Sequence, residues 1–363
     1  MHKFVLNFLN FLNFLNFLQL LELLELLELL ERLELLGLLK KLKIMSVSDF
    51  LGGSHQTAFS FEVLPPLRGK GIEQVYNTIE RLMPYNPSYI NITTHRAEIS
   101  YKEMADGSFQ RLFQHKRPGT VAIAAAIKAR YNIPTVPHII CSGFTAQELE
   151  NELIDLSYLD IMDLIVLRGD RAKGESCFIP AKGGHAHATE LCKQVMEFNQ
   201  GRLIDGTTFE SMNGGKKFSF GVAGYPEKHE EAMNMTTDIS YLKQKIANGA
   251  SYVVTQMFFD NKKYFSYVER LRSEGITVPV IPGLKPLTTM RQQHLLPNTF
   301  HIDFPEELSA ELLKCKDNDD VKRLGIEWGV HQARELREAN VPSLHFYTMN
   351  ATASVEEIVK RLV

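Results

Sequence analysis

Eight short apolar runs, almost every one ending in polar or charged residues, constrain the fold of this chain more than any other feature. They span residues 58–65, 89–94, 135–141, 163–170, 218–225, 252–260, 278–286 and 344–350, with helix-like stretches between them. Strands that alternate with helices imply a parallel sheet, and about eight such units match the size of a closed (β/α)8 TIM barrel. In such a barrel the carboxyl ends of the strands build the active site. We therefore expect one catalytic domain in which the strand-end residues share a cavity: Glu62, Thr93, His138, Asp170, Tyr225 and Gln256.

The composition is that of an ordinary globular protein. Hydrophobic residues make up 44% of the chain, charged residues 23%, and the net charge is -3 at pH 7. The pI of about 6.5 and the lack of a basic tract with interleaved aromatic residues argue against a nucleic-acid partner. The 4 cysteines show no C-x-x-C spacing. A reduced, cytoplasmic protein is the expected class.

Residues 1–44 form a low-complexity extension rich in Leu, Asn, Phe and Glu. Asn-Phe-Leu recurs between Asn7 and Leu18, and a Leu-Leu-Glu-like period follows. A period of three drifts by about 60° per repeat around a helix, so no apolar stripe results. Glutamates are too frequent for a membrane span, and a signal peptide would need an uninterrupted apolar core. We expect translation to start at Met45 and residues 45–363 to form the folded domain; an amphipathic membrane or oligomerisation helix is the alternative.

Motifs for common cofactors and metals are missing or weak. No G-x-G-x-x-G lies between an expected strand and helix, and Gly214–Lys217 is expected to be a turn and not a phosphate-binding loop. His185 and His187 alternate as metal ligands can, but they lie in a Gly-rich loop without acidic partners. We therefore expect no metal site.

Two strand-end motifs carry acid–base and charge chemistry. Glu62 has apolar and aromatic neighbours, and burial would raise the pKa of its carboxyl group toward the range of a general acid. A structural ion pair is the alternative for Glu62. The motif Leu167-Arg168-Gly169-Asp170 ends an apolar run with a cation, a close-approach glycine and an anion. It is either a surface ion-pair turn or a site for a charged cofactor.

Together, these motifs resemble those of the methylenetetrahydrofolate reductase family, from about Phe59 to the C-terminus. Each motif is weak alone, but their joint occurrence in the right order is specific. In chain order they are Phe61-Glu62-Val63-Leu64-Pro65-Pro66, Asn91-Ile92-Thr93, Pro137-His138, Leu167-Arg168-Gly169-Asp170, Ala223-Gly224-Tyr225-Pro226-Glu227-Lys228-His229, Thr255-Gln256-Met257-Phe258-Phe259-Asp260, Ile281-Pro282-Gly283 and Leu344-His345-Phe346-Tyr347-Thr348.

The resemblance, to bacterial-type members with the catalytic barrel alone, implies a flavin-dependent reductase. NADH or NADPH would reduce bound FAD, leave, and be replaced by 5,10-methylenetetrahydrofolate, which becomes 5-methyltetrahydrofolate for methionine synthesis. The expected partners are these small molecules, with neither nucleic acid nor membrane among them. Relatives in the family suggest a homo-oligomer, a dimer or tetramer, although the sequence shows no diagnostic interface. Without a C-terminal regulatory region, we expect no feedback by S-adenosylmethionine.

The same resemblance implies roles for individual residues. Glu62 matches the acid that assists opening of the folate ring, and Asp170 is expected near the flavin ring. Gln256 and Gln292 match the positions that hold the pterin and the pyridine nucleotide. The residues implied to bind FAD are Thr93, His138, Leu167, Arg168, Gly169, Asp170, Ala188, Tyr225, His229, Ala232, Asp238 and Lys245.

Four residues depart from the family pattern and bear on cofactor and folate affinity. Thr94 replaces a common Tyr, and Gln244 replaces a basic residue that helps to hold the FAD phosphates. Leu296 stands where some members have Phe, and Ala351 where Arg is typical. Neither the acid nor the Asp170 motif is affected.

Two alternatives from other classes stay open at this point. One is a metal-dependent barrel hydrolase built on His185, His187 and Asp170. The other is a non-catalytic barrel that binds flavin or folate, although such a barrel would not need Glu62. The sequence does not rank NADH against NADPH, because no separate nucleotide-binding fold can be read.

Overall fold

The computed structural model describes residues 46–53, 57–172, 174–349 and 351–363. Within them, eight parallel strands close into a barrel with the order β1-β10-β9-β8-β7-β6-β5-β2. This confirms the predicted (β/α)8 barrel, and each apolar run contributes one strand. The prediction for residues 1–44 lies outside the described residues. The barrel strands are β1 (Ala58–Val63), β2 (Tyr89–Ile92), β5 (Thr135–Ile140), β6 (Asp163–Leu167), β7 (Ser219–Gly224), β8 (Tyr252–Met257), β9 (Val280–Leu284) and β10 (Ser343–Tyr347).

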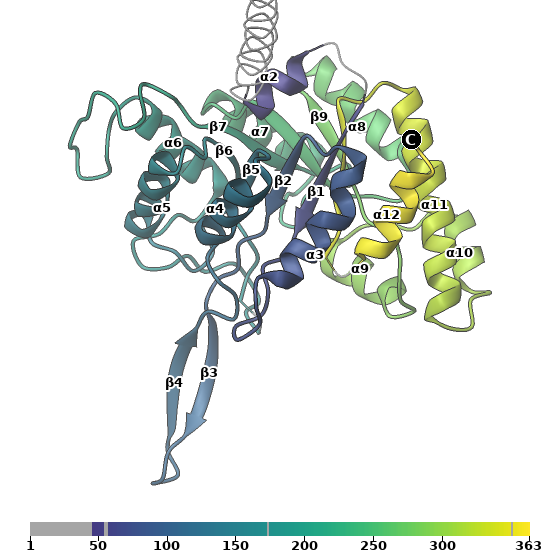
Figure 1. Ribbon diagram of the computed structural model, residues 1–363, viewed down its shortest axis with the longest axis horizontal. Helices are drawn as coiled ribbons and strands as arrows, with labels where there is room; N and C mark the ends of the chain where they lie inside the picture. The colour runs from purple at the N-terminus through teal and green to yellow at the C-terminus, as the bar shows by residue number, and fades with distance from the viewer. Residues whose placement is uncertain (1–45, 54–56, 173, 350) are drawn as a thin grey trace, which may run out of the picture. The chain divides into compact units, whose positions relative to one another are not determined.

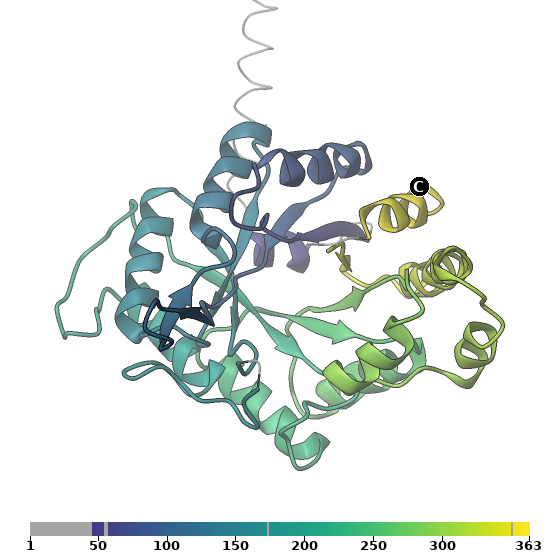
Figure 2. The same ribbon diagram turned by 90° about the horizontal axis from the view of Figure 1, so that it is seen from below.

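Helices cover the outside of the barrel, as Figures 1 and 2 show from two directions. Thr145 and Glu148 form a capping box at the start of α5, where each side chain accepts a backbone N–H of the other residue. Gly214 and Gly215 adopt positive φ angles in the turn before β7, as predicted. The covering helices are α3 (Glu73–Leu82), α4 (Thr120–Tyr131), α5 (Ala146–Tyr158), α6 (Ala188–Asn199), α7 (Met235–Ala247), α8 (Asn261–Ser273), α11 (Asn318–Glu338) and α12 (Thr352–Lys360).

Several elements have no counterpart in the sequence-based prediction. An antiparallel hairpin pairs Tyr101 with Arg111 and extends away from the barrel in Figure 1. Residues 101–111 are all exposed, so the hairpin lacks the buried face that produces a recognisable alternation of apolar and polar residues. The additional elements are β3 (Glu98–Glu103), β4 (Phe109–Gln114), α2 (Val47–Gly52), η1 (Met83–Tyr85), α9 (Gln292–Phe300) and α10 (Glu306–Leu312).

Alternate residues of the barrel strands face the helices and the barrel interior. Phe61 on β1 and Phe346 on β10 are paired in register, stack with ring centroids 6.0 Å apart, and share an apolar cluster with Ile358 of α12. Because side chains alternate along a strand, the residues next to Phe61 and Phe346 face the interior. These interior positions include Glu62 and His345.

Helix α2 packs at the amino-terminal end of the barrel. Val47 and Leu51 share an apolar cluster with Tyr89, which lies at the start of β2. The Val47 N–H donates a hydrogen bond of 2.8 Å to the carboxylate of Asp163, the first residue of β6. Burial raises the pKa of Asp163 to about 7, despite the opposing hydrogen bond from Val47. The ionisation of Asp163 is therefore linked to the packing of α2 against the barrel.

The raised pKa of Asp163 makes the stability depend on pH. Because the pKa is higher in the folded than in the unfolded chain, stability contributed by this group is present at low pH and is lost as the pH rises toward about 7. Asp163→Asn keeps an oxygen acceptor for Val47 but cannot ionise. Relative to the wild type, its free energy of unfolding should gain up to about 3 kcal/mol between pH 5 and pH 8. Denaturant titrations at both pH values measure this, with exposed Asp319→Asn on α11 as the control. Equal differences at both pH values would contradict the prediction.

Candidate active site

A buried carboxylate lies at the centre of the strand-end residues. Glu62, near the carboxyl end of β1, is 6% exposed and pairs in register with Tyr347 on β10 and Asn91 on β2. Its Oε2 lies 3.6 Å from Nε2 of His138 on β5 and 3.8 Å from Nε2 of His345 on β10. Several strands thus direct polar side chains at one acid, as the carboxyl ends of barrel strands do in enzymes.

The ring of His345 is oriented by a second residue of β1. Its Nδ1 lies 3.0 Å from Oγ of Ser60. The Ser60 hydroxyl can donate to Nδ1, and the neutral imidazole then carries its hydrogen on Nε2, the atom that faces Glu62. Ser60, His345 and Glu62 therefore form a line of polar groups inside the barrel.

The sequence predicted a raised pKa for Glu62 because of burial, and this prediction is wrong for the net pKa. Burial alone does raise it, but attraction from His345, His138 and Lys285 outweighs burial and leaves the pKa below its usual value. Burial lowers the pKa of His138 to about 4, so that imidazole is neutral near pH 7. Lys285, at the end of β9, adds a further charge attraction to Glu62. The resting form of Glu62 is therefore the carboxylate.

The Leu167–Asp170 motif forms a tight turn after β6. Gly169 has φ +79°, and an added Cβ would lie 2.9 Å from Cβ of Ser142. The predicted close-approach glycine is thus present. The Ser142 hydroxyl donates to the carbonyl of Asp170 at 2.6 Å. Burial lowers the pKa of His95 and raises the pKa of Tyr225, and the charge of the exposed Asp170 carboxylate adds a smaller upward contribution to each.

Arg168 does not form the surface ion pair with Asp170 that the motif allowed. Its guanidinium pairs with Glu231 and lies over the ring of Phe178, 4.7 Å from the centroid. Its Nε is buried and has no hydrogen-bond partner within the described part of the chain. Such an unpaired donor is costly and marks a position where a further acceptor would be stabilising.

Other residues implied to bind FAD lie around the end of β7. The rings of Tyr225 and His229 meet edge to face, with their centroids 4.7 Å apart. The Asp238 carboxylate accepts a hydrogen bond of 3.1 Å from the backbone N–H of His229. The Lys245 ammonium donates to the carbonyl of Ala223 at 2.9 Å, and Asp238 and Lys245 are both buried. Ala232 is buried in the loop between β7 and α7.

The remaining predicted residues are on other elements. Oγ1 of Thr93 lies 3.2 Å from Nε2 of His95. Leu167 ends β6, and Ala188 is the first residue of α6. Gln256 is half-buried on β8.

Gln292 begins α9, where its Oε1 accepts the N–H groups of Thr288 and Thr289. The contacts of the described residues do not connect it to Glu62.

The four departures from the family pattern have different surroundings. The Thr94 hydroxyl donates to the carbonyl of His138, and Gln244 is exposed on α7. Leu296 is 2% exposed and packs in an apolar cluster, so it is not presented to a ligand at the surface. Ala351 is the buried residue that precedes α12.

The two loop histidines belong to the start of α6. Nε2 of His185 lies 2.6 Å from Oε1 of Gln194, and Glu190 accepts the N–H groups of Ala186 and His187. Among the described residues, no three His, Cys, Asp or Glu side chains are grouped as metal ligands. Across the same residues, the helices are too short or too polar to cross a membrane.

Sequence reasoning missed Lys285, His345 and Tyr347 as members of the Glu62 cluster. Two signals were available. His345 and Tyr347 alternate with the outward-facing Phe346, and Lys285 is a charged residue inside the apolar run 278–286. What the sequence did not show was the register of the strands, which decides which side chains reach Glu62.

The fold and this cluster define a (β/α)8 barrel with acid–base groups at the carboxyl ends of its strands. Within that class the chain belongs to a known family: the family model described as methylenetetrahydrofolate reductase matches residues 47–363.

Relatives with this family name come from plants, animals and bacteria. Methylenetetrahydrofolate reductase (NADH) 1 of Zea mays is 28% identical over 320 residues, which cover 85% of this chain and 49% of the relative. A probable methylenetetrahydrofolate reductase (NADPH) of Caenorhabditis elegans is 28% identical, covering 85% and 42%. The 5,10-methylenetetrahydrofolate reductase of Escherichia coli is 26% identical, covering 81% and 87%. The chain thus spans about half the length of the plant relatives.

Gly283 on β9 tests how tightly the site is packed. An added Cβ would lie 2.3 Å from the carbonyl oxygen of Thr255 and 2.6 Å from Cε2 of Tyr347. Because a barrel carbonyl cannot move away, Gly283→Ala should lower the free energy of unfolding by roughly 2–4 kcal/mol. Gly119→Ala, where the added carbon meets nothing within 4 Å, should cost less than about 1 kcal/mol. A loss of stability in Gly283→Ala as small as the loss in Gly119→Ala would show that the site tolerates the extra carbon.

Proposed function

We propose that this protein reduces 5,10-methylenetetrahydrofolate to 5-methyltetrahydrofolate, with NADH or NADPH as the electron source and FAD as a bound carrier. The product is a methyl donor suited to methionine synthesis. Family membership supports the reaction class. The single observation that carries the proposal is the buried Glu62 with His138 and His345 within 4 Å at the carboxyl ends of the strands.

The residues near β6 and β7 suit FAD. Arg168 and Lys245 offer positive charge for a diphosphate, and the unpaired Nε of Arg168 can still donate a hydrogen bond. Gly169 lets the turn after β6 pack closely against Ser142, and the exposed carboxylate of Asp170 follows this turn. When bound, FAD would carry two electrons from the nicotinamide to the folate.

Glu62 would supply the proton that the folate half of the cycle requires. Hydride cannot easily enter the closed ring of the substrate, so N10 must be protonated before its bond to the methylene carbon breaks. Glu62 is the buried carboxyl group available for this step, and His345, held by Ser60, can orient it. Because Glu62 rests as a carboxylate, it must take up one proton in each turnover. Folate reduction should therefore slow as the pH rises above the pKa of Glu62.

A direct test of the proposal is to reconstitute the purified protein with FAD. Binding should give a flavin absorption band, and the loaded protein should convert 5,10-methylenetetrahydrofolate to the methyl product with NADH or NADPH. Running both nucleotides side by side also decides between them. A colourless protein after reconstitution, or no methyl product with either nucleotide, would overturn the proposal.

Glu62→Gln should separate the two halves of the cycle. Reduction by NADH or NADPH needs no proton on the folate, so its rate should stay within about tenfold of the wild type. Reoxidation by 5,10-methylenetetrahydrofolate should slow by about 10²–10⁴, the usual loss when a general acid is removed. Stopped-flow absorbance follows each half separately, with exposed Glu73→Gln on α3 as the matched control. Equal slowing of both halves would instead assign Glu62 a structural role.

Asp170→Asn should raise the midpoint potential of bound FAD. A nearby anion disfavours the electron-rich reduced form, and the amide removes that charge while keeping the size of the side chain. Folate reduction should also slow. Spectroelectrochemical titration measures the potential, with exposed Asp155→Asn on α5 as the control. An unchanged potential would place Asp170 away from the flavin.

A further inference from the structure

Lys285 is a charged residue where the sequence would otherwise continue a buried apolar run. It directly follows Leu284, the last residue of β9, and precedes Pro286. Its side chain is half-buried. A lysine in such a place loses hydration, and burial lowers the pKa of Lys285 accordingly. A cation kept there against this cost requires an explanation.

The strand register places Lys285 at the level of Glu62. Leu284 on β9 pairs with Phe346 on β10, and Phe346 pairs with Phe61 on β1. All three are buried in the cluster that faces the covering helices. One residue further along each strand come Lys285, Tyr347 and Glu62, which therefore face the interior at the same level.

Gly283 and Tyr347 occupy the space between these two charged residues. The Tyr347 hydroxyl donates to the carbonyl of Thr255 on β8 at 2.7 Å, so its ring crosses in front of β9. Gly283 makes room for that ring, because any Cβ there would lie 2.6 Å from it.

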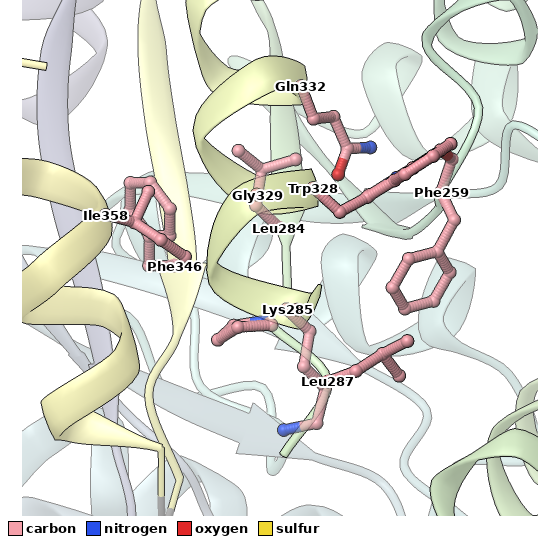
Figure 3. Close-up of a pocket in the computed structure, with 11 residues that line it drawn as sticks. Phe259, Leu284, Lys285, Leu287, Trp328, Gly329, Gln332, Phe346 and Ile358 are labelled. Carbon is pink, nitrogen blue, oxygen red and sulfur yellow. The ribbon is translucent and has the colours of Figure 1, made fainter. Parts of the chain in front are cut away.

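The ammonium of Lys285 is within electrostatic reach of Glu62. Their strands are separated by β10 alone, which corresponds to about 10 Å between strand axes, a gap that two extended side chains can largely close. Figure 3 shows the Lys285 side chain extending away from Trp328 and Gln332, which line the pocket beside α11. Its Nζ lies 3.4 Å from Sδ of Met349, just beyond the end of β10. Lys285 and Glu62 each act electrostatically on the other.

We propose that Lys285 is a positioning residue for the acid step: its ammonium stabilises the carboxylate that remains when Glu62 gives its proton to the folate substrate. This inference rests on the proposed function. N10 of the folate is an arylamine nitrogen whose lone pair is shared with the ring, so it is a weak base and a difficult proton acceptor. A fixed cation beside the donor lowers the free energy of the charged carboxylate as it forms.

The step is balanced without a change on Lys285. The O–H bond of Glu62 breaks and an N–H bond forms at N10, after which the bond from N10 to the methylene carbon breaks and leaves an iminium at N5. Lys285 keeps its proton throughout, and Glu62 regains one from solvent. The other titratable groups that face or act on Glu62 are His138 on β5, His345 and Tyr347 on β10, and His95 after β2.

Lys285→Met tests this role, because Met has a similar length but no charge. The folate half-reaction should slow by roughly three- to tenfold at low pH, where Glu62 is protonated in both proteins, while reduction by NADH or NADPH stays unchanged. The pH at which the folate half-reaction falls off should move upward, since the carboxylate loses its cation. Lys285→Arg should restore much of both properties. Exposed Lys322→Met on α11 is the matched control and should change neither.

A second measurement keeps the inference testable apart from the proposed reaction. Glutamate labelled with carbon-13 at the carboxyl group allows Glu62 to be titrated by NMR, with Glu62→Gln identifying its signal. In Lys285→Met the titration midpoint of Glu62 should move to higher pH. An unmoved midpoint, or equal slowing of both half-reactions, would overturn the role of Lys285 even in an active reductase. A protein that makes no methyl product but shows the moved midpoint would overturn the proposed function and retain the Lys285–Glu62 interaction.

Discussion

The cost of burying the Glu62 carboxylate is the constraint on which the arrangement of this site depends. An isolated charge inside a protein is strongly destabilising unless hydrogen-bond donors or opposite charges surround it. In this barrel the partners come from several strands: His138 from β5, His345 from β10 and Lys285 from the end of β9. None of them is local to β1. The closed barrel is therefore a condition for the ionised acid, because only closure brings the end of β9 and β10 next to the first strand.

The register between the strands links the polar contacts of Glu62 to the packing of the barrel against its helices. A shift of one residue in β10 would turn His345 and Tyr347 outward and Phe346 inward, and would break the cluster with Phe61 and Ile358 at the same time. Apolar packing against the helices and polar contacts inside the barrel thus favour the same register. Gly283 adds a steric condition, since its missing side chain lets Tyr347 reach the carbonyl of Thr255.

The fold could be predicted from the sequence because its signals are local. Apolar runs bounded by polar residues, the Thr145–Glu148 capping box and the glycines at 214 and 215 each depend on near neighbours only. The hairpin around Tyr101 was missed because both of its faces are exposed. For the site, Glu62 and the Gly169 turn were recognisable from their own motifs. The cluster around Glu62 depends on the register between strands, which no single motif contains.

The pKa of Glu62 shows why the chemistry of a residue is harder to predict than its position. Its apolar neighbours along β1 predict a raised pKa, and burial does act in that direction. The sign reverses because cations and donors from distant parts of the chain converge on the same carboxylate. An acid that rests ionised beside a lysine is stronger and is less often protonated near neutral pH, so its strength and its availability oppose each other. For a weakly basic acceptor such as an arylamine nitrogen, strength is the scarcer property, which gives a physical reason for a lysine at a position where the apolar run alone would call for a hydrophobic residue.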